Sequence, residues 1–141
     1  MKKPKLRIFK SRLLLALVSL SLITVSSCTK SSNSSGNAGA IFAGTWNGTS
    51  SCGGTASFIL TSSGNTVSTT GSVGSGSCTK AITFSGTASG NNVVFPSQTY
   101  TDGCGNSYTI SGAGTISGST LTLTETATGT ISASCTFTGT K

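Results

Sequence analysis

The residues that could carry chemistry in this chain are few, and most of them are cysteines. Five cysteines occur, whereas the chain has no His and only two carboxylates, Asp102 and Glu125. Without an imidazole, a Ser or Cys nucleophile lacks its usual general base. Asp102 lies in the turn-like sequence 102–106, where an Asp side chain commonly bonds its own backbone. We therefore expect no catalytic residue, no cofactor and no enzymatic activity.

The cysteines after Cys28 form a group of four, Cys52, Cys78, Cys104 and Cys135. A four-thiolate zinc site normally contains closely spaced CxxC pairs, and this sequence has none. The same absence argues against a redox-active CxxC. We expect no metal site and interpret the four cysteines as two structural disulfides, for which three pairings exist.

The basic residues are concentrated at one end of the chain. A 13-residue apolar run, 13–25, follows them; it is shorter than the roughly 20 residues of a membrane-spanning helix and typical of a signal peptide. After Cys28 the net charge is near +1, so no basic patch is left for nucleic acid. Six of the nine basic residues precede the run: Lys2, Lys3, Lys5, Arg7, Lys10 and Arg12.

The four residues Val25-Ser26-Ser27-Cys28 resemble the lipobox of bacterial lipoproteins. The resemblance implies that residues 1–27 are a signal peptide, that cleavage occurs before Cys28, and that Cys28 carries the lipid. Several acyl chains, at about 0.8 kcal/mol per buried CH₂, would hold such a protein on a membrane permanently.

Residues 28–39 follow as the lipidated Cys28 and a tether rich in Ser, Gly and Asn, a composition typical of flexible linkers. In lipoproteins resembling this one, Thr29 in place of Asp after the Cys implies the outer membrane. No acidic residue precedes Asp102, which favours the periplasmic face over the cell surface.

The cysteines and the turn sequences repeat together along residues 40–141. Cys52, Cys78 and Cys104 are 26 residues apart, and Cys135 follows after 31. Related turn sequences, SGNTV, SGNNV and SGSTL, begin 11, 11 and 13 residues after the first three cysteines. Such Gly-containing pairs between alternating segments are hairpin signals. Each repeat is therefore two short strands and one tight turn.

This repeat predicts eight antiparallel strands with all three S-G turns at one end and the first three cysteines at the other. Even hairpin spacing favours an all-β up-and-down barrel, with a β-sandwich as the alternative. Pro96 interrupts the alternation of its strand and indicates a bulge. The expected strands are 41–51, 55–62, 66–74, 80–87, 92–101, 107–116, 120–128 and 130–139.

Alternation assigns an inner apolar face to nearly every strand and leaves Thr and Ser outside. The sequence Phe42-Ala43-Gly44-Thr45-Trp46 resembles the opening of lipocalin-like domains, and the segment 135–141 resembles the last strand of small lipocalin-like lipoproteins of Bacteroidota-type bacteria. The resemblance covers residues 40–141. An Arg often packs on this Trp in that family, and this chain has no Arg after Arg12.

In this register Cys52 is in phase with Trp46 and Cys135 with Phe137, so both are expected to point inward. The first and last strands are neighbours in a closed barrel, and Cys78 and Cys104 fall in connections at one end. We therefore favour Cys52–Cys135 with Cys78–Cys104 over the other pairings. Each bond would contribute about 2–4 kcal/mol.

Lys80 and Glu125 are in phase with inward apolar neighbours, towards the cysteine end of their strands. They are candidate contacts for the polar head of a ligand, together with Trp46 on the same inner face. The alternative is that both are strand-end residues facing water, or a plain ion pair.

Three functions fit this pattern. The first is a lipid-anchored, monomeric, lipocalin-like domain that binds a small apolar ligand. The second is a protein-binding module such as a hydrolase inhibitor, and the third is a passive envelope component.

Overall fold

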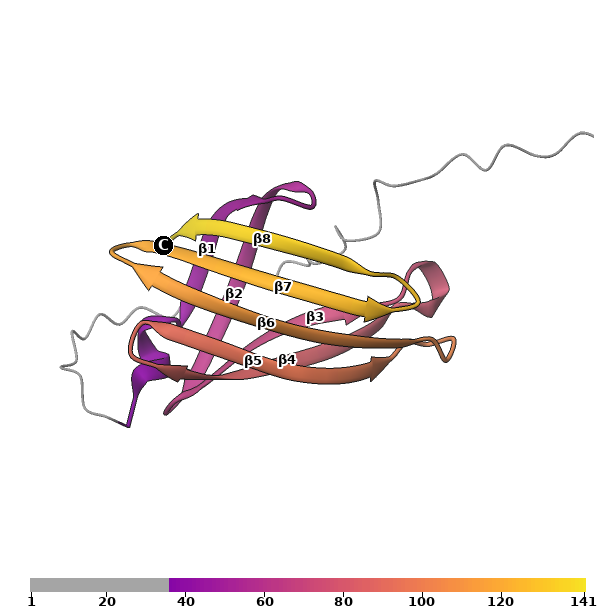
Figure 1. Cartoon of the computed structure of the whole chain (residues 1–141), viewed down its shortest axis with the longest axis horizontal. Coiled ribbons are helices and arrows are strands. Elements are labelled where there is room, and N and C mark those ends of the chain that lie inside the picture. Colours follow the sequence, from indigo (N-terminus) through magenta and orange to yellow (C-terminus); the bar gives the residue numbers. More distant parts are fainter. Residues whose placement is uncertain (1–35) are drawn as a thin grey trace, which may run out of the picture.

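Residues 36–141 are the part of the chain that the computed structural model describes. They form a closed antiparallel barrel in which each strand pairs with the next and β8 returns to β1 (Figure 1). The predicted up-and-down barrel is confirmed, and the sandwich alternative is wrong. The predicted signal peptide, Cys28 and most of the tether lie outside the described residues. The strands are β1 (Gly44–Ser50), β2 (Gly54–Ser63), β3 (Thr66–Val73), β4 (Lys80–Ser89), β5 (Asn92–Thr101), β6 (Ser107–Ser117), β7 (Thr120–Gly129) and β8 (Ala133–Thr140).

The two ends of the barrel are built differently. One end, here the turn end, consists of the two-residue turns 64–65, 90–91 and 118–119. Gly64, Gly90 and Gly118 begin these turns with φ of 59°, 55° and 60°, a region that glycine enters without the steric cost of a Cβ. The other end, here the cysteine end, consists of the connections 51–53, 74–79, 102–106 and 130–132. The predicted separation of turns and cysteines is confirmed.

The first strand begins later than predicted because the chain before it forms a 3₁₀ helix, η1 (Ala38–Ile41). The backbone N–H of Gly39 donates to the Gly64 carbonyl over 3.1 Å, and a Cβ on Gly39 would lie 2.6 Å from that oxygen. This close approach holds η1 against the turn end and directs Phe42 into the core, where it is fully buried. The folded unit therefore starts slightly before residue 40. The last strand also starts later, at Ala133 instead of 130.

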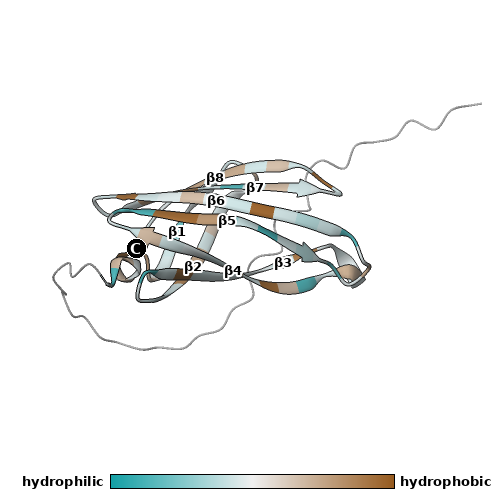
Figure 2. Cartoon of the chain, turned by 60° about the horizontal axis from the view of Figure 1, so that its bottom comes forward, coloured by the Kyte–Doolittle hydropathy of each residue, from teal (hydrophilic) through white to brown (hydrophobic). Residues whose placement is uncertain are grey.

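The core lies inside the barrel and consists of one residue in two along most strands. Phe84 and Phe95 stack with centroids 4.8 Å apart, and Phe58 meets Phe137 edge-on at 4.7 Å. The pale, intermediate hydropathy along most of the strands in Figure 2 reflects the alternating Thr, Ser and Gly. The buried apolar residues are Phe42, Trp46, Leu60, Val67, Val73, Phe84, Ala88, Val93, Phe95, Tyr108, Ile110, Ile116, Leu121, Leu123 and Phe137.

Two disulfides close the cysteine end, Cys52–Cys135 and Cys78–Cys104, with Cα atoms 5.4 and 5.1 Å apart. The favoured pairing is confirmed. The expectation that Cys52 points inward is wrong, because β1 ends at Ser50 and Cys52 is exposed in the connection 51–53. Strand alternation no longer applies outside the strand. Cys135 is half-buried on β8.

The two disulfides should differ in their contribution to stability. Cys52–Cys135 spans 83 residues and Cys78–Cys104 spans 26, and a longer closed loop removes more entropy from the unfolded chain. Replacing both cysteines of the first pair by Ser should lower the free energy of unfolding by about 1 kcal/mol more than replacing the second pair. Urea denaturation under non-reducing conditions measures both. Equal losses would contradict the loop-length argument.

Candidate functional site

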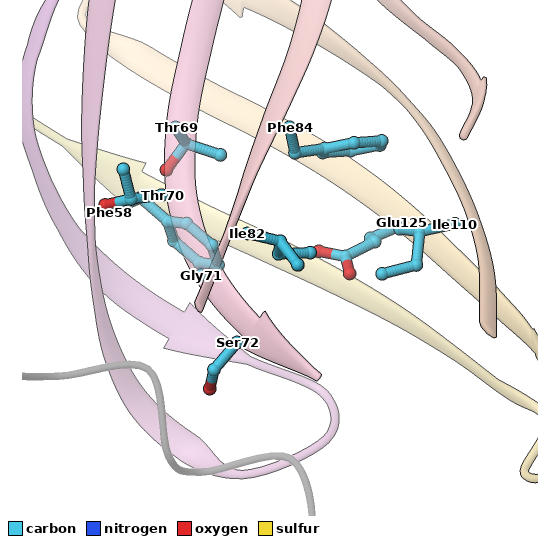
Figure 3. Close-up of a pocket in the computed structure, with 9 residues that line it drawn as sticks. All are labelled: Phe58, Thr69, Thr70, Gly71, Ser72, Ile82, Phe84, Ile110 and Glu125. Atoms are coloured by element: carbon cyan, nitrogen blue, oxygen red, sulfur yellow. The ribbon is translucent and has the colours of Figure 1, made fainter. Parts of the chain in front are cut away.

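The barrel contains a small, partly open cavity of about 40 Å³ in its cysteine-end half. Its lining comes from five strands, and Glu125 of β7 is its one charged residue (Figure 3). The other residues are aromatic, aliphatic or hydroxyl-bearing, so a carboxylate here faces a largely apolar wall. The lining residues are Phe58, Thr69, Thr70, Gly71, Ser72, Ile82, Phe84, Ile110 and Glu125.

The cavity lies where the wall of the barrel is least continuous. β2 and β3 pair only through residues 61–63 and 66–68, next to their shared turn. Beyond that point β2 continues to pair with β1, and β3 with β4. Four consecutive residues of β3, 69–72, line the cavity, which therefore runs along the β3 edge that no longer pairs with β2.

The wall is also incomplete between β4 and β5, but there side chains span the gap. The two strands pair only through residues 87–89 and 92–94, and β5 then bulges between Phe95 and Gln98. The Gln98 side-chain oxygen accepts a hydrogen bond from the Ser85 N–H over 3.3 Å, and its amide nitrogen donates to the Ser85 carbonyl over 2.8 Å. The side-chain amide therefore makes the two hydrogen bonds that a paired strand residue would make. Tyr100 donates its hydroxyl to the Thr83 carbonyl over 2.7 Å. The bulge predicted from Pro96 is confirmed.

Glu125 is the one predicted ligand contact that lines the cavity. Its side chain is half-buried and extends among apolar groups, with Ile82 and Ile110 beside it in Figure 3. Burial raises the pKa of the Glu125 carboxyl, because the charged form loses hydration. Within residues 36–141, we find no hydrogen bond or ion pair that compensates for this loss. The inward orientation predicted for Glu125 is confirmed.

Lys80 does not line the cavity with Glu125. Its pairing with the buried Val73 places it on the inner face, as predicted, but it is the first residue of β4 and is exposed, which matches the alternative of a strand-end residue facing water. A strand-end ammonium keeps its hydration by reaching into water, which favours exposure over burial. The alternative of an ion pair with Glu125 is not observed in the described part of the chain.

Trp46 does not line the cavity, and other residues of the protein cover almost all of its surface. It is 1% exposed, and its indole N–H donates to the Phe42 carbonyl over 2.7 Å. The Lys141 ammonium lies 4.6 Å from the ring centroid and donates to the carbonyls of Ile41 and Ala43 over 2.7 Å each. The Lys141 ammonium therefore covers the Trp46 ring.

Sequence reasoning missed this role of Lys141. The signal was present in the expected closure of the barrel, since the residue that follows the last strand must lie beside the beginning of the first. Burial lowers the pKa of the Lys141 ammonium, and the two carbonyls and the ring face supply the contacts that offset its lost hydration.

Asp102 is bound by its own loop, as its turn sequence predicted. Its Oδ1 accepts the backbone N–H groups of Cys104 and Asn106, and its Oδ2 accepts the Asn106 side-chain amide, each over 2.9 Å. The Tyr108 hydroxyl also donates to Oδ2, over 3.2 Å. The Asn106 side chain is the main reason that the pKa of Asp102 is lowered. Asp102 therefore organises a loop and is not free to act as a base.

No family model, no curated protein and no solved structure matches this chain. Across residues 36–141, no helix has the length and apolar character needed to span a membrane. The same residues contain no cluster of three or more potential metal ligands. The cavity beside Glu125 is thus the strongest candidate site in the described part of the chain.

The interaction of Lys141 with Trp46 should stabilise the barrel. Lys141→Met keeps much of the aliphatic stem but removes the ammonium, its cation–π contact and two donated hydrogen bonds. We expect a loss of about 1–2 kcal/mol in the free energy of unfolding, measured by urea denaturation. Lys80→Met, which alters an exposed Lys at the other end, is the control and should change little. Equal effects of the two substitutions would contradict a specific role for Lys141.

Glu125 and Asp102 should give opposite dependences of stability on pH. The pKa of Glu125 is raised on folding, so the unfolded chain ionises first and wild-type stability relative to Glu125→Gln should fall as pH rises above about 4. The pKa of Asp102 is lowered, so its contribution relative to Asp102→Asn is present at neutral pH and lost in acid. Thermal melts from pH 3 to 8 measure both. A Glu125→Gln difference that is independent of pH would contradict the assignment.

Proposed function

We propose that the protein is a lipid-anchored lipoprotein of the bacterial cell envelope whose barrel binds a small, largely apolar ligand without transforming it. The observation that carries the binding role is the cavity, which combines an apolar wall with one charged group. Ligand sites commonly have this composition, with apolar surface for affinity and a polar group for orientation.

The size of the cavity restricts how a ligand can bind. A volume of about 40 Å³ holds a few water molecules at most, whereas sites for drug-sized ligands measure roughly 300–1,000 Å³. One compact group of a ligand can enter the cavity, and the remainder must lie in the opening between β2 and β3. Three residue pairs hold these strands together, so the opening can widen without loss of many backbone hydrogen bonds.

The barrel has too few charged residues to be held at a membrane by electrostatic attraction, so the lipid anchor would have to hold it there. Cys28 would carry the acyl chains, and the tether to residue 39 would separate the barrel from the bilayer. The absence of His from the whole chain and the engagement of Asp102 in its loop support binding without catalysis.

Native mass spectrometry of the protein purified from its host tests the binding role. We expect a population heavier than the mature lipoprotein, with an added mass that dissociates at moderate collision energy. The same sample denatured in organic solvent is the control and should show the lipoprotein mass alone. A protein without adduct that also fails to bind apolar fluorescent dyes would overturn the binding role, and a protein-sized adduct would favour the protein-binding module.

The anchor predicts a change in lipid labelling and in processing. Cys28→Ala removes the thiol that would be acylated and alters the cleavage motif, so the protein should lose incorporation of an alkyne-labelled fatty acid and retain the mass of residues 1–27. Ser31→Ala in the tether is the control and should behave as wild type. Equal incorporation of the fatty acid into the Cys28→Ala protein and wild type would refute lipidation at this residue.

A further inference from the structure

Residues 36–141 contain only four charged side chains, so the interactions of each can be compared. They are Lys80, Asp102, Glu125 and Lys141. Asp102 is satisfied within its loop, and Lys141 is engaged by two carbonyls and Trp46 next to the turn end. Lys80 is exposed and does not line the cavity. Glu125 is therefore the one charged group in this part of the chain that is at least half-buried with neither a counter-charge nor a hydrogen bond.

Such a carboxylate is costly to the folded protein. Buried charges in proteins are normally paired or hydrogen-bonded, because a carboxylate loses several kcal/mol of hydration on burial. The Glu125 side chain extends between Ile82 and Ile110, with the Phe84 ring nearby (Figure 3). A Leu or Val at position 125 would continue the apolar series Leu121, Leu123 without this cost.

We propose that Glu125 binds the protonated amine of a ligand whose apolar part lies between β2 and β3 against Phe58 and Ile82. This inference rests on the proposed binding function and specifies the class of ligand. The ammonium of the ligand would supply the counter-charge that Glu125 lacks within residues 36–141.

An ammonium group suits the cavity in size and surroundings. It is compact enough for a cavity of about 40 Å³. Its three N–H donors can meet the Glu125 carboxylate and the hydroxyl of Thr69, which also lines the cavity. The rings of Phe58 and Phe84 line the same space, and aromatic rings attract cations.

Other occupants fit less well. A divalent cation requires several oxygen ligands, and Glu125 is the single carboxylate of the lining. A neutral ligand could accept a hydrogen bond from a protonated Glu125, and such a ligand would bind equally well as an alcohol. An amine and the alcohol of the same shape therefore distinguish the two cases.

Isothermal titration calorimetry at pH 7 with 2-phenylethylamine and 2-phenylethanol tests the inference. The proteins are wild type, Glu125→Gln, which keeps the shape of the side chain, and Lys80→Ala, which removes the exposed cation at the cysteine end. We expect the amine to bind wild type and Lys80→Ala at least about tenfold more tightly than the alcohol. Glu125→Gln should lose this preference by a similar factor.

Each other outcome is decisive. If the alcohol binds wild type as tightly as the amine, or if Glu125→Gln retains the preference for the amine, the inference is overturned while small-ligand binding stands. If neither compound binds, the inference is overturned, and if the protein from its host also carries no small molecule, the proposed binding function is overturned with it. Circular dichroism of each variant confirms that it is folded before titration.

Discussion

Closure of the barrel by β1 and β8 is the constraint on which the rest of the structure depends. The two strands pair over only four residues, Asn47–Ser50 of β1 with Phe137–Thr140 of β8. Gly48 faces Gly139 in this seam, and a Cβ on Gly48 would overlap the Thr138 carbonyl. Without closure both strands would expose unpaired edges, which favour aggregation.

The seam is fastened at both ends by different chemistry. At the cysteine end, the Cys52–Cys135 disulfide joins the chain just after β1 to β8. At the turn end, Lys141 binds two carbonyls of the segment that leads into β1 and covers Trp46. A short strand pair is therefore held at one end by a covalent bond and at the other by the hydrogen bonds and cation–π contact of Lys141.

The position of the cavity follows from the uneven wall of the barrel. Pairing is short between β2 and β3 and between β4 and β5. The second gap is spanned by Gln98 and Tyr100, while the cavity with Glu125 lies along the first. The two carboxylates of the domain differ for a related reason: Asp102 is surrounded by donors of its own loop, and Glu125 faces the open side of an apolar interior.

Much of the fold was determined by local sequence. Alternation and the Gly-containing turns predicted eight strands, and all strand ends agree within a few residues. The late start of β1 has a long-range cause, since the contact of Gly39 with Gly64 holds the preceding residues as a 3₁₀ helix. The spacing of the cysteines, read on a closed barrel, also predicted both disulfides. Of the candidate contacts, Glu125 lines the cavity, whereas Lys80 and Trp46 do not.

Only the tertiary structure decided which of those residues a ligand could reach. The phase of a residue along its strand predicts which face of the sheet it lies on, but not how exposed it is. Lys80 is exposed because it lies at the end of the barrel. Trp46 is buried, and Lys141 covers its ring. The cavity follows from where β2 and β3 stop pairing, a relation between strands that no single strand encodes. Sequence by itself determined the strands, the turns and the lone Glu125; packing across the barrel left that carboxylate without a counter-charge.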